Sequence, residues 1–203
     1  MNRPILIGIG ASHSGAGKTT LASNIFQHFA LRPFPADIHR LLRWGAIKYT
    51  RTESPAEVIS DRSILMEEGK DTCMMLTSGA EDVIWVRAGH SGLRDALLRA
   101  VTRLSHLDAL IIEGNSAIEF LNPDIVIFIF GTEKEHWKPG IEKLAARADI
   151  IFAAADVQLP GDIQPGHRFP GGLSEDESKG FFPALTRMVY ERRTETGDAQ
   201  KGR

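Results

Sequence analysis

The chain has 203 residues, of which 42% are hydrophobic and 25% charged, and its formal net charge at pH 7 is −2. This length and apolar content suit one α/β domain with its own core and leave little room for a second complete domain. The slightly negative charge gives no basic footprint for nucleic acid or for an anionic membrane surface. The single cysteine, Cys73, excludes an internal disulfide framework, and the apolar run at 4–9 is too short for a signal sequence or a membrane span. We therefore expect a cytoplasmic protein that binds neither nucleic acid nor membrane.

Short apolar runs of strand length alternate with segments of helical length along most of the chain. The runs predict strands at residues 5–9, 44–47, 83–86, 109–112, 125–130 and 150–154. Between them, the apolar spacing predicts a helix over 93–104 and a shorter helix over 142–147. This alternation is typical of a three-layer α/β fold, in which helices flank a mostly parallel sheet.

Two segments interrupt this pattern. Residues 49–69 are polar and then mixed, and we expect a loop or flap there. Residues 157–180 are rich in proline, glycine and acidic residues, which predicts loop or disorder. A docking helix over 181–192 and a frayed polar tail over 194–203 would follow. We therefore expect a main domain over residues 1–156, followed by an appended segment over 157–203.

The most informative motif lies at residues 8–21, which read GIGASHSGAGKTTL. Its glycines permit tight turns, successive backbone N–H groups then point into one concavity, and the following helix adds the positive end of its dipole. Lys18 is expected to reach the β- and γ-phosphates of a nucleotide and to take part in catalysis, while Thr19 offers a hydroxyl to Mg²⁺. The residues expected to bind the phosphates are Ser14, Gly15, Ala16, Gly17, Lys18, Thr19 and Thr20.

Two further residues of this segment, Ser12 and His13, bear on the geometry of the loop. Ser12 stands where the full motif GxxxxGK[ST] has its first glycine, so the chain is expected to enter the loop differently. His13 lies inside the loop, where it either touches a phosphate or points to solvent, and we expect the latter.

Charged residues near the ends of other strands complete the expected site. Glu113 follows the run at 109–112, and ligands of open α/β sheets sit beyond strand C-termini, so Glu113 is predicted to assist Mg²⁺ and catalysis. Lys48 follows the run at 44–47, where it can neutralise phosphate charge or be an ordinary solvated lysine. Lys70 and Asp71 can lie across the phosphates, or Asp71 can serve only as a helix cap.

Four motifs occur in the same order as in a known family, at residues 14–20, 47–48, 69–72 with 78–80, and 111–114. With them the chain resembles the molybdopterin-guanine dinucleotide biosynthesis protein B (MobB) family of P-loop NTPases. The resemblance implies GTP and Mg²⁺ at Lys18, Thr19 and Glu113, with Lys48 and Lys70 facing the nucleotide or a pterin phosphate. It also implies a homodimer with an accessory role, which supplies bound GTP to a molybdenum cofactor guanylyltransferase acting on molybdopterin. Hydrolysis is expected to be weak, because no arginine finger or water-positioning glutamine can be placed in the sequence.

Alternatives of two other classes stay open. The first is an ATP-dependent small-molecule kinase or ligase resembling dethiobiotin synthetase, in which residues 49–69 would bind the acceptor. The second is a nucleotide-gated adaptor or metallochaperone GTPase. The identity of the nucleotide base is equally open. Asp156 alone can accept hydrogen bonds from guanine, and ATP remains an alternative to GTP.

Overall fold

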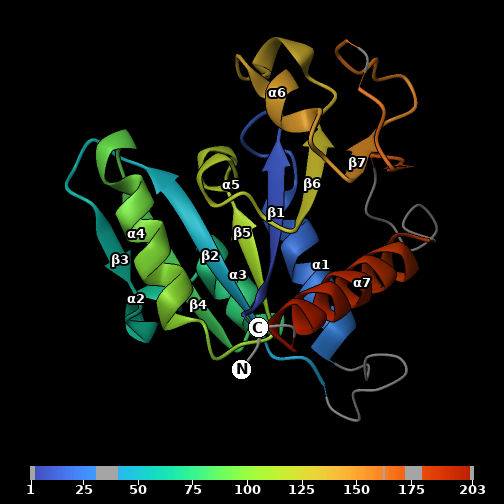
Figure 1. The fold of residues 1–203 in the computed structure, drawn as a ribbon. Coiled ribbons are helices and arrows are strands. Elements are labelled where there is room, and N and C mark those ends of the chain that lie inside the picture. Colours follow the sequence, from blue (N-terminus) through green and yellow to red (C-terminus); the bar gives the residue numbers. More distant parts are fainter. Residues whose placement is uncertain (1–2, 31–40, 162, 172–179, 202–203) are drawn as a thin grey trace.

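A computed structural model describes residues 3–30, 41–161, 163–171 and 180–201, and the strands within them form one sheet (Figure 1). The strand order is β3-β4-β2-β5-β1-β6-β7-β8. All neighbouring strands are parallel except β3, which pairs with β4 in the antiparallel direction. The strands are β1 (Ile5–Ala11), β2 (Trp44–Arg51), β3 (Glu57–Ile59), β4 (Asp82–Ala88), β5 (Ala109–Glu113), β6 (Ile125–Phe130), β7 (Ile150–Ala153) and β8 (His167–Phe169).

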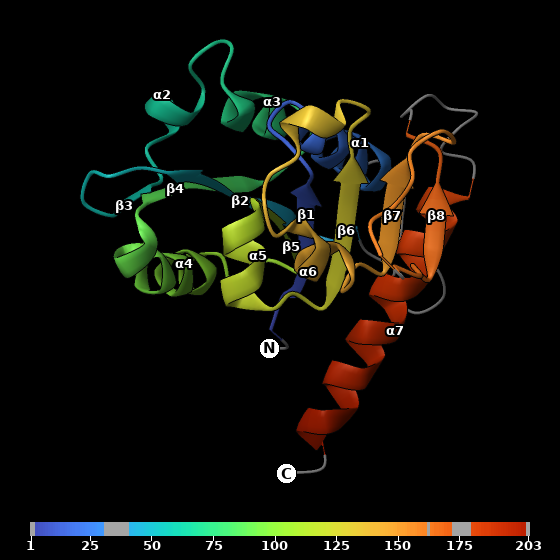
Figure 2. The ribbon, with the colours of Figure 1, turned by 90° about the horizontal axis from the view of Figure 1, so that it is seen from above.

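Helices cover both faces of this sheet. Seen from above in Figure 2, α1 and α3 lie on one side of the strands, and α4, α5 and α6 lie on the other. The helices are α1 (Lys18–Ala30), α2 (Arg62–Leu65), α3 (Asp71–Thr77), α4 (His90–Arg103), α5 (Asn115–Leu121), α6 (Ile141–Ala145) and α7 (Phe181–Lys201), with a short 3-10 turn, η1 (Lys134–His136). The predicted three-layer α/β fold with a mostly parallel sheet is confirmed, and a glycine-rich turn joins β1 to α1. Among the described residues, no helix combines the length and apolarity that a membrane span requires.

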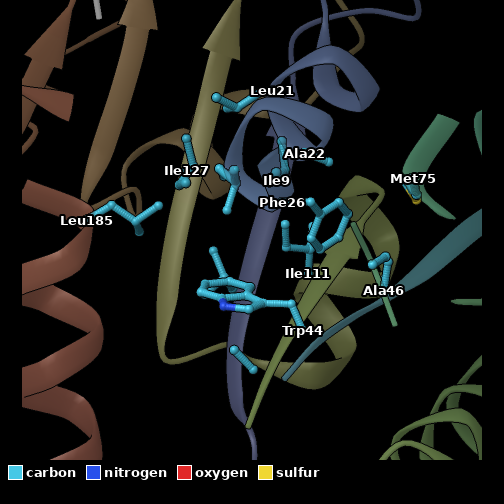
Figure 3. Packing of buried hydrophobic residues seen from close by; sticks show 14 of the residues in the cluster. Ile9, Leu21, Ala22, Phe26, Trp44, Ala46, Met75, Ile111, Ile127 and Leu185 are labelled. Carbon is cyan, nitrogen blue, oxygen red and sulfur yellow. The ribbon is translucent and has the colours of Figure 1, made fainter. Parts of the chain in front are cut away.

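The largest core cluster lies between the sheet and α1. In the close-up of Figure 3, Phe26 of α1 and Trp44 of β2 lie over the strand residues Ile9 and Ile111. Leu185 of α7 belongs to the same cluster, and the ring of Phe182 stacks on that of His28 with centroids 3.9 Å apart. The C-terminal helix therefore packs on the same core as the β1–α1 unit.

The regions where the apolar pattern was weakest differ from expectation. The strand predicted at 44–47 continues to Arg51 because it pairs with β4 through Arg51 and Ala88. Part of the expected loop over 49–69 forms β3 and α2, and β8 forms within the proline-rich segment by pairing with β7. Within that segment, residues 162 and 172–179 lie outside the described residues.

The expectation of a helix ending at 192 and a frayed tail from 194 is wrong, because α7 continues to Lys201. An apolar stripe does not extend that far, but the described polar contacts continue as far as Glu195. Arg193 donates to the carboxylate of Asp108 at 3.2 Å, and Arg192 pairs with Glu195 at 3.2 Å one turn later. Apolar periodicity therefore predicts the docked part of the helix and not the polar turns that follow it.

Candidate functional site

The glycine-rich loop joins the end of β1 to the first turn of α1. Gly15 and Gly17 have φ angles of +83° and +91°, a region that residues with a Cβ rarely adopt. No atom lies within 4 Å of the position that a Cβ would take at either residue, so backbone conformation rather than crowding requires glycine there. The loop thus presents its backbone N–H groups beside the N-terminus of a helix 13 residues long, an arrangement suited to anions.

Ser12 ties the entry of this loop to the neighbouring strand. Its backbone N–H donates to the carbonyl of Ile129 at 2.9 Å, and its hydroxyl accepts the N–H of Gly131 at 2.9 Å. Its carbonyl accepts the N–H of Lys138 at 2.8 Å. The side chain is fully buried, so the residue in place of the motif's first glycine anchors the loop instead of leaving it open.

His13 does not point to solvent, contrary to expectation. Its Nε2 atom is buried, and a Cβ placed on Gly131 would lie only 1.8 Å from that atom. Its Nδ1 atom lies 2.6 Å from the carbonyl oxygen of Ser14. The imidazole therefore packs against Gly131, which keeps the loop close to the segment that follows β6.

Glu113 is the centre of a polar network at the end of β5. The residue is only 1% exposed, and its carboxylate accepts hydrogen bonds from the hydroxyl of Thr19 at 3.0 Å and from the ammonium of Lys48. The same Lys48 ammonium lies 2.5 Å from the carboxylate of Asp71. Lys48 and Glu113 are register partners on adjacent parallel strands, which explains how both side chains reach one place. A buried carboxylate is therefore held between a hydroxyl in the first turn of α1 and a lysine.

The pKa values of the two central lysines, Lys18 and Lys48, shift in opposite directions. Burial lowers the pKa of Lys18, and the charges of Lys48 and Lys138 lower it further, although Glu113 and Asp71 oppose them. Burial also acts to lower the pKa of Lys48, but its contacts with Glu113 and Asp71 outweigh burial and raise it. Lys48 is thus a fixed cation, while burial disfavours the charged form of Lys18, and an anion bound beside Lys18 would favour that form again.

The structure places five of the seven predicted loop residues along a cavity of about 530 Å³, whereas Lys18 and Thr19 are not among its lining residues. Its other wall comes from the segments that follow β6, β7 and β8. The lining residues include Ser14, Gly15, Ala16, Gly17 and Thr20 on the loop side, and Gly131, Thr132, Glu133, Ala154 and Gly171 opposite them. Asp156, considered for base recognition, is exposed on the surface.

Lys70 and Asp71 take different positions relative to this cavity. Asp71 joins the Glu113 network through Lys48, and the backbone cap of α3 is Lys70, so Asp71 is not merely a helix cap. The ammonium of Lys70 binds the carboxylate of Glu67 at 2.8 Å and lies 5.0 Å above the ring centroid of Trp85. The structure therefore brings Asp71 to the central network and places Lys70 beside Trp85.

Two residues near the site were not found from the sequence. Asn115 makes two hydrogen bonds to the end of β1. Its side-chain oxygen accepts the N–H of Ala11, and its side-chain amide donates to the Ala11 carbonyl, both at 3.0 Å. The available signal was an asparagine directly after the Glu113–Gly114 pair. Lys138 adds positive charge near Lys18, but it lies in an irregular segment where spacing gives no signal.

Comparisons with known proteins give a structural similarity but no match to a protein family or a curated protein. No protein-family model matches the sequence, and no curated protein matches it. Among solved structures, a crystal structure of a LAO/AO transport system kinase is similar, with a TM-score of 0.45 and 14% sequence identity. The match covers 98% of this chain, which spans 66% of the length of that one. The fold class rests on the strand order and loop geometry of this chain itself.

Proposed function

We propose that this protein binds a purine nucleoside triphosphate together with Mg²⁺ and hydrolyses it slowly. The observation that carries the proposal is the hydrogen bond between Thr19, at the start of α1, and the buried carboxylate of Glu113 on the neighbouring strand. A hydroxyl and a carboxylate are hard oxygen ligands of the kind Mg²⁺ takes, usually one or two from the protein with the rest from phosphates and water. The glycine-rich loop beside them suits the phosphates.

The volume of the cavity supports a nucleotide as the ligand. Its volume of about 530 Å³ lies within the range of small-molecule sites, about 300–1,000 Å³. With the phosphates on the loop and Lys18, the base would extend toward Thr132, Ala154 and Gly171. Lys18 then supplies the positive charge for the β- and γ-phosphates.

Slow turnover follows from the residues that line this cavity. Fast phosphoryl transfer to water usually needs an arginine that stabilises the transition state and a glutamine that positions the water. Among the described lining residues of the cavity there is neither an arginine nor a glutamine. Weak intrinsic hydrolysis is therefore expected, and the proposed catalytic groups are Lys18 and Glu113, which lie outside this lining.

GTP is the proposed nucleotide, with ATP as the alternative, on the strength of the resemblance to the MobB family. The same resemblance supports an accessory role for a cytoplasmic homodimer in molybdopterin-guanine dinucleotide formation.

Calorimetric titration with GTP and with ATP, each in the presence and absence of Mg²⁺, tests the proposal. The wild-type protein is expected to bind GTP more tightly than ATP and more tightly with Mg²⁺ than without it. Lys18→Ala should lose this binding, while Lys143→Ala, which changes an exposed lysine on α6, should retain it. Unchanged affinity in Lys18→Ala would show that the site is misassigned, and a preference for ATP would favour a kinase or ligase.

A further inference from the structure

The segment that follows β6 is fastened at both ends to the entry of the glycine-rich loop. Ser12 accepts two hydrogen bonds from this segment, because its hydroxyl accepts the N–H of Gly131 at 2.9 Å and its carbonyl accepts the N–H of Lys138 at 2.8 Å. Within the segment, the indole N–H of Trp137 donates to the carbonyl of Gly131 at 3.0 Å. Ser12 is fully buried, so it holds the 131–138 segment in place at the end of the sheet where β1 meets the loop (Figure 1).

The same anchor brings the side chain of Lys138 close to that of Lys18. Lys138 is exposed, and it lies in the part of the chain between β6 and α6 rather than in the loop itself. Its ammonium nevertheless acts through space on the ammonium of Lys18, since its positive charge is one of the causes that lower the pKa of Lys18. The interaction between two charges weakens with distance, particularly across water, so the two ammonium groups share one neighbourhood. Lys138 therefore brings a second positive charge to the loop from a separate segment.

Lys18 and Lys138 differ from Lys48 in how their charge is balanced. The ammonium of Lys48 is held directly by two carboxylates, those of Glu113 and Asp71. Across the part of the chain that the structure describes, neither Lys18 nor Lys138 forms an ion pair. The carboxylates of Glu113 and Asp71 act on Lys18 only at longer range. Two ammonium groups at the loop are therefore open to direct contact with an anion, and phosphate oxygens would provide that contact.

We propose that Lys138 is a second phosphate-binding lysine, which contacts the γ-phosphate of the bound nucleotide. The assignment rests on the proposed function, in which Lys18 meets the β- and γ-phosphates and the base extends toward Ala154 and Gly171. The nucleotide then runs from Lys18 toward the ends of β7 and β8. A cation beside Lys18, anchored at the entry of the loop, meets the terminal phosphate and not the base. There it supplies positive charge of the kind that an arginine provides in faster enzymes.

The test compares the affinity for a nucleoside triphosphate with the affinity for the corresponding diphosphate. Calorimetric titrations with Mg²⁺ use GTPγS and GDP as probes, or ATPγS and ADP if the wild type prefers adenine. In Lys138→Ala the dissociation constant of the triphosphate should rise by about tenfold or more, because one charge-assisted contact is lost. The dissociation constant of the diphosphate should stay near its wild-type value. The backbone N–H that donates to Ser12 is retained in this variant, so the substitution removes the charge and not the anchor.

Two further variants separate a direct contact from a general effect of charge. Lys134→Ala is the matched control, because it removes the same charge from the same segment, where the Lys134 ammonium lies 5.8 Å from the ring centroid of Trp137. It should bind both probes as the wild type does. Lys138→Arg keeps the charge and should recover most of the affinity for the triphosphate. An equal loss in Lys134→Ala, or equal losses of triphosphate and diphosphate in Lys138→Ala, would overturn the role of Lys138.

Failure of this inference differs from failure of the proposed function. If the wild type binds neither triphosphate, the proposed function is wrong, and the role of Lys138 is wrong with it. If the wild type binds the triphosphate and Lys18→Ala does not, while Lys138→Ala keeps the wild-type affinity, the nucleotide site stands and only the role of Lys138 is wrong. Diphosphate binding by Lys138→Ala also shows that this variant is folded, so a loss confined to the triphosphate is local.

Discussion

One ammonium group, that of Lys48, holds carboxylates from two different elements, Glu113 on β5 and Asp71 on α3. From the sequence, Lys48 was either a phosphate ligand or a solvated lysine at the end of a strand. Because β2 continues past it and pairs with β5 in register, the side chain is largely buried and lies opposite Glu113. The solvated alternative is therefore wrong, and contact with phosphate stays a prediction.

We predict that nucleotide affinity falls at alkaline pH and that Lys18 sets where the fall begins. Burial, together with the charges of Lys48 and Lys138, lowers the pKa of Lys18, so it loses its proton at a lower pH than an ordinary lysine. The protonated form binds phosphate, so affinity is retained below that pKa and declines by up to about tenfold per pH unit above it. Calorimetric titrations between pH 7 and 10 measure this.

Lys18→Arg is the control for that pH dependence. An arginine keeps its charge throughout this range, so the variant should bind more weakly because its shape differs, but with a flatter pH profile. A wild-type profile as flat as that of Lys18→Arg would contradict the assignment of Lys18.

Gly131→Ala is predicted to disturb the glycine-rich loop through His13. The new Cβ would lie 1.8 Å from Nε2 of His13, so the imidazole must move, and its neighbour Ser14 with it. We expect the free energy of unfolding to fall by about 1–3 kcal/mol, as for other overpacked sites, and nucleotide affinity to fall as well. Urea denaturation and calorimetry measure the two effects.

The double variant His13→Ala with Gly131→Ala tests the cause. Removal of the imidazole makes room for the Cβ, so the two substitutions together should cost less than their sum. Strict additivity would mean that the effect of Gly131→Ala does not pass through His13.

The parts of the site that follow one another in sequence were predictable, and the parts joined by tertiary contact were not. The run 14–20 and the acidic end of β5 carry their chemistry in local spacing, so Lys18, Thr19 and Glu113 could be named as candidates. The anchoring of Ser12 to Gly131 joins residues 119 positions apart. No local pattern carries that information.

At the level of elements, the long apolar runs in the sequence predicted most strands of the sheet. The runs at 5–9, 109–112 and 125–130 are buried strands at the centre of the sheet, where every side chain contributes to the signal. The missed strands β3 and β8 have three residues each and lie at the edges. Their existence depends on the strand beside them, so three residues of sequence could not reveal it.

Because α7 is docked on the core, two leucine-to-alanine substitutions are predicted to lower the free energy of unfolding by very different amounts. Leu185 on α7 is fully buried in the main core cluster, whereas Leu98 on α4 is 50% exposed. Leu185→Ala is expected to lower the free energy of unfolding by about 2–5 kcal/mol because it leaves a cavity. Leu98→Ala should change it by no more than about 0.5 kcal/mol. Urea denaturation of both variants checks this, and equal effects would show that α7 is not docked as described.

For the whole molecule, ligand binding and stability are linked. A nucleotide that binds only the folded chain, at a hundred times its dissociation constant, should add about 2.7 kcal/mol to the free energy of unfolding. For a chain of this size that corresponds to a rise in melting temperature of about 5–11 °C. Thermal denaturation with and without Mg²⁺-nucleotide measures the rise, and Lys18→Ala should show none.

The two edges of the sheet bear on how copies of this chain can associate. The described edge strands, β3 and β8, each offer three residues, and on β3 the side chain of Glu57 is paired with Arg87 of β4 at 3.2 Å. Short, charged edges discourage the addition of a strand from another molecule. A homodimer of this protein would therefore have to form through helix faces and loops, and its two sheets would stay separate instead of merging into one continuous sheet.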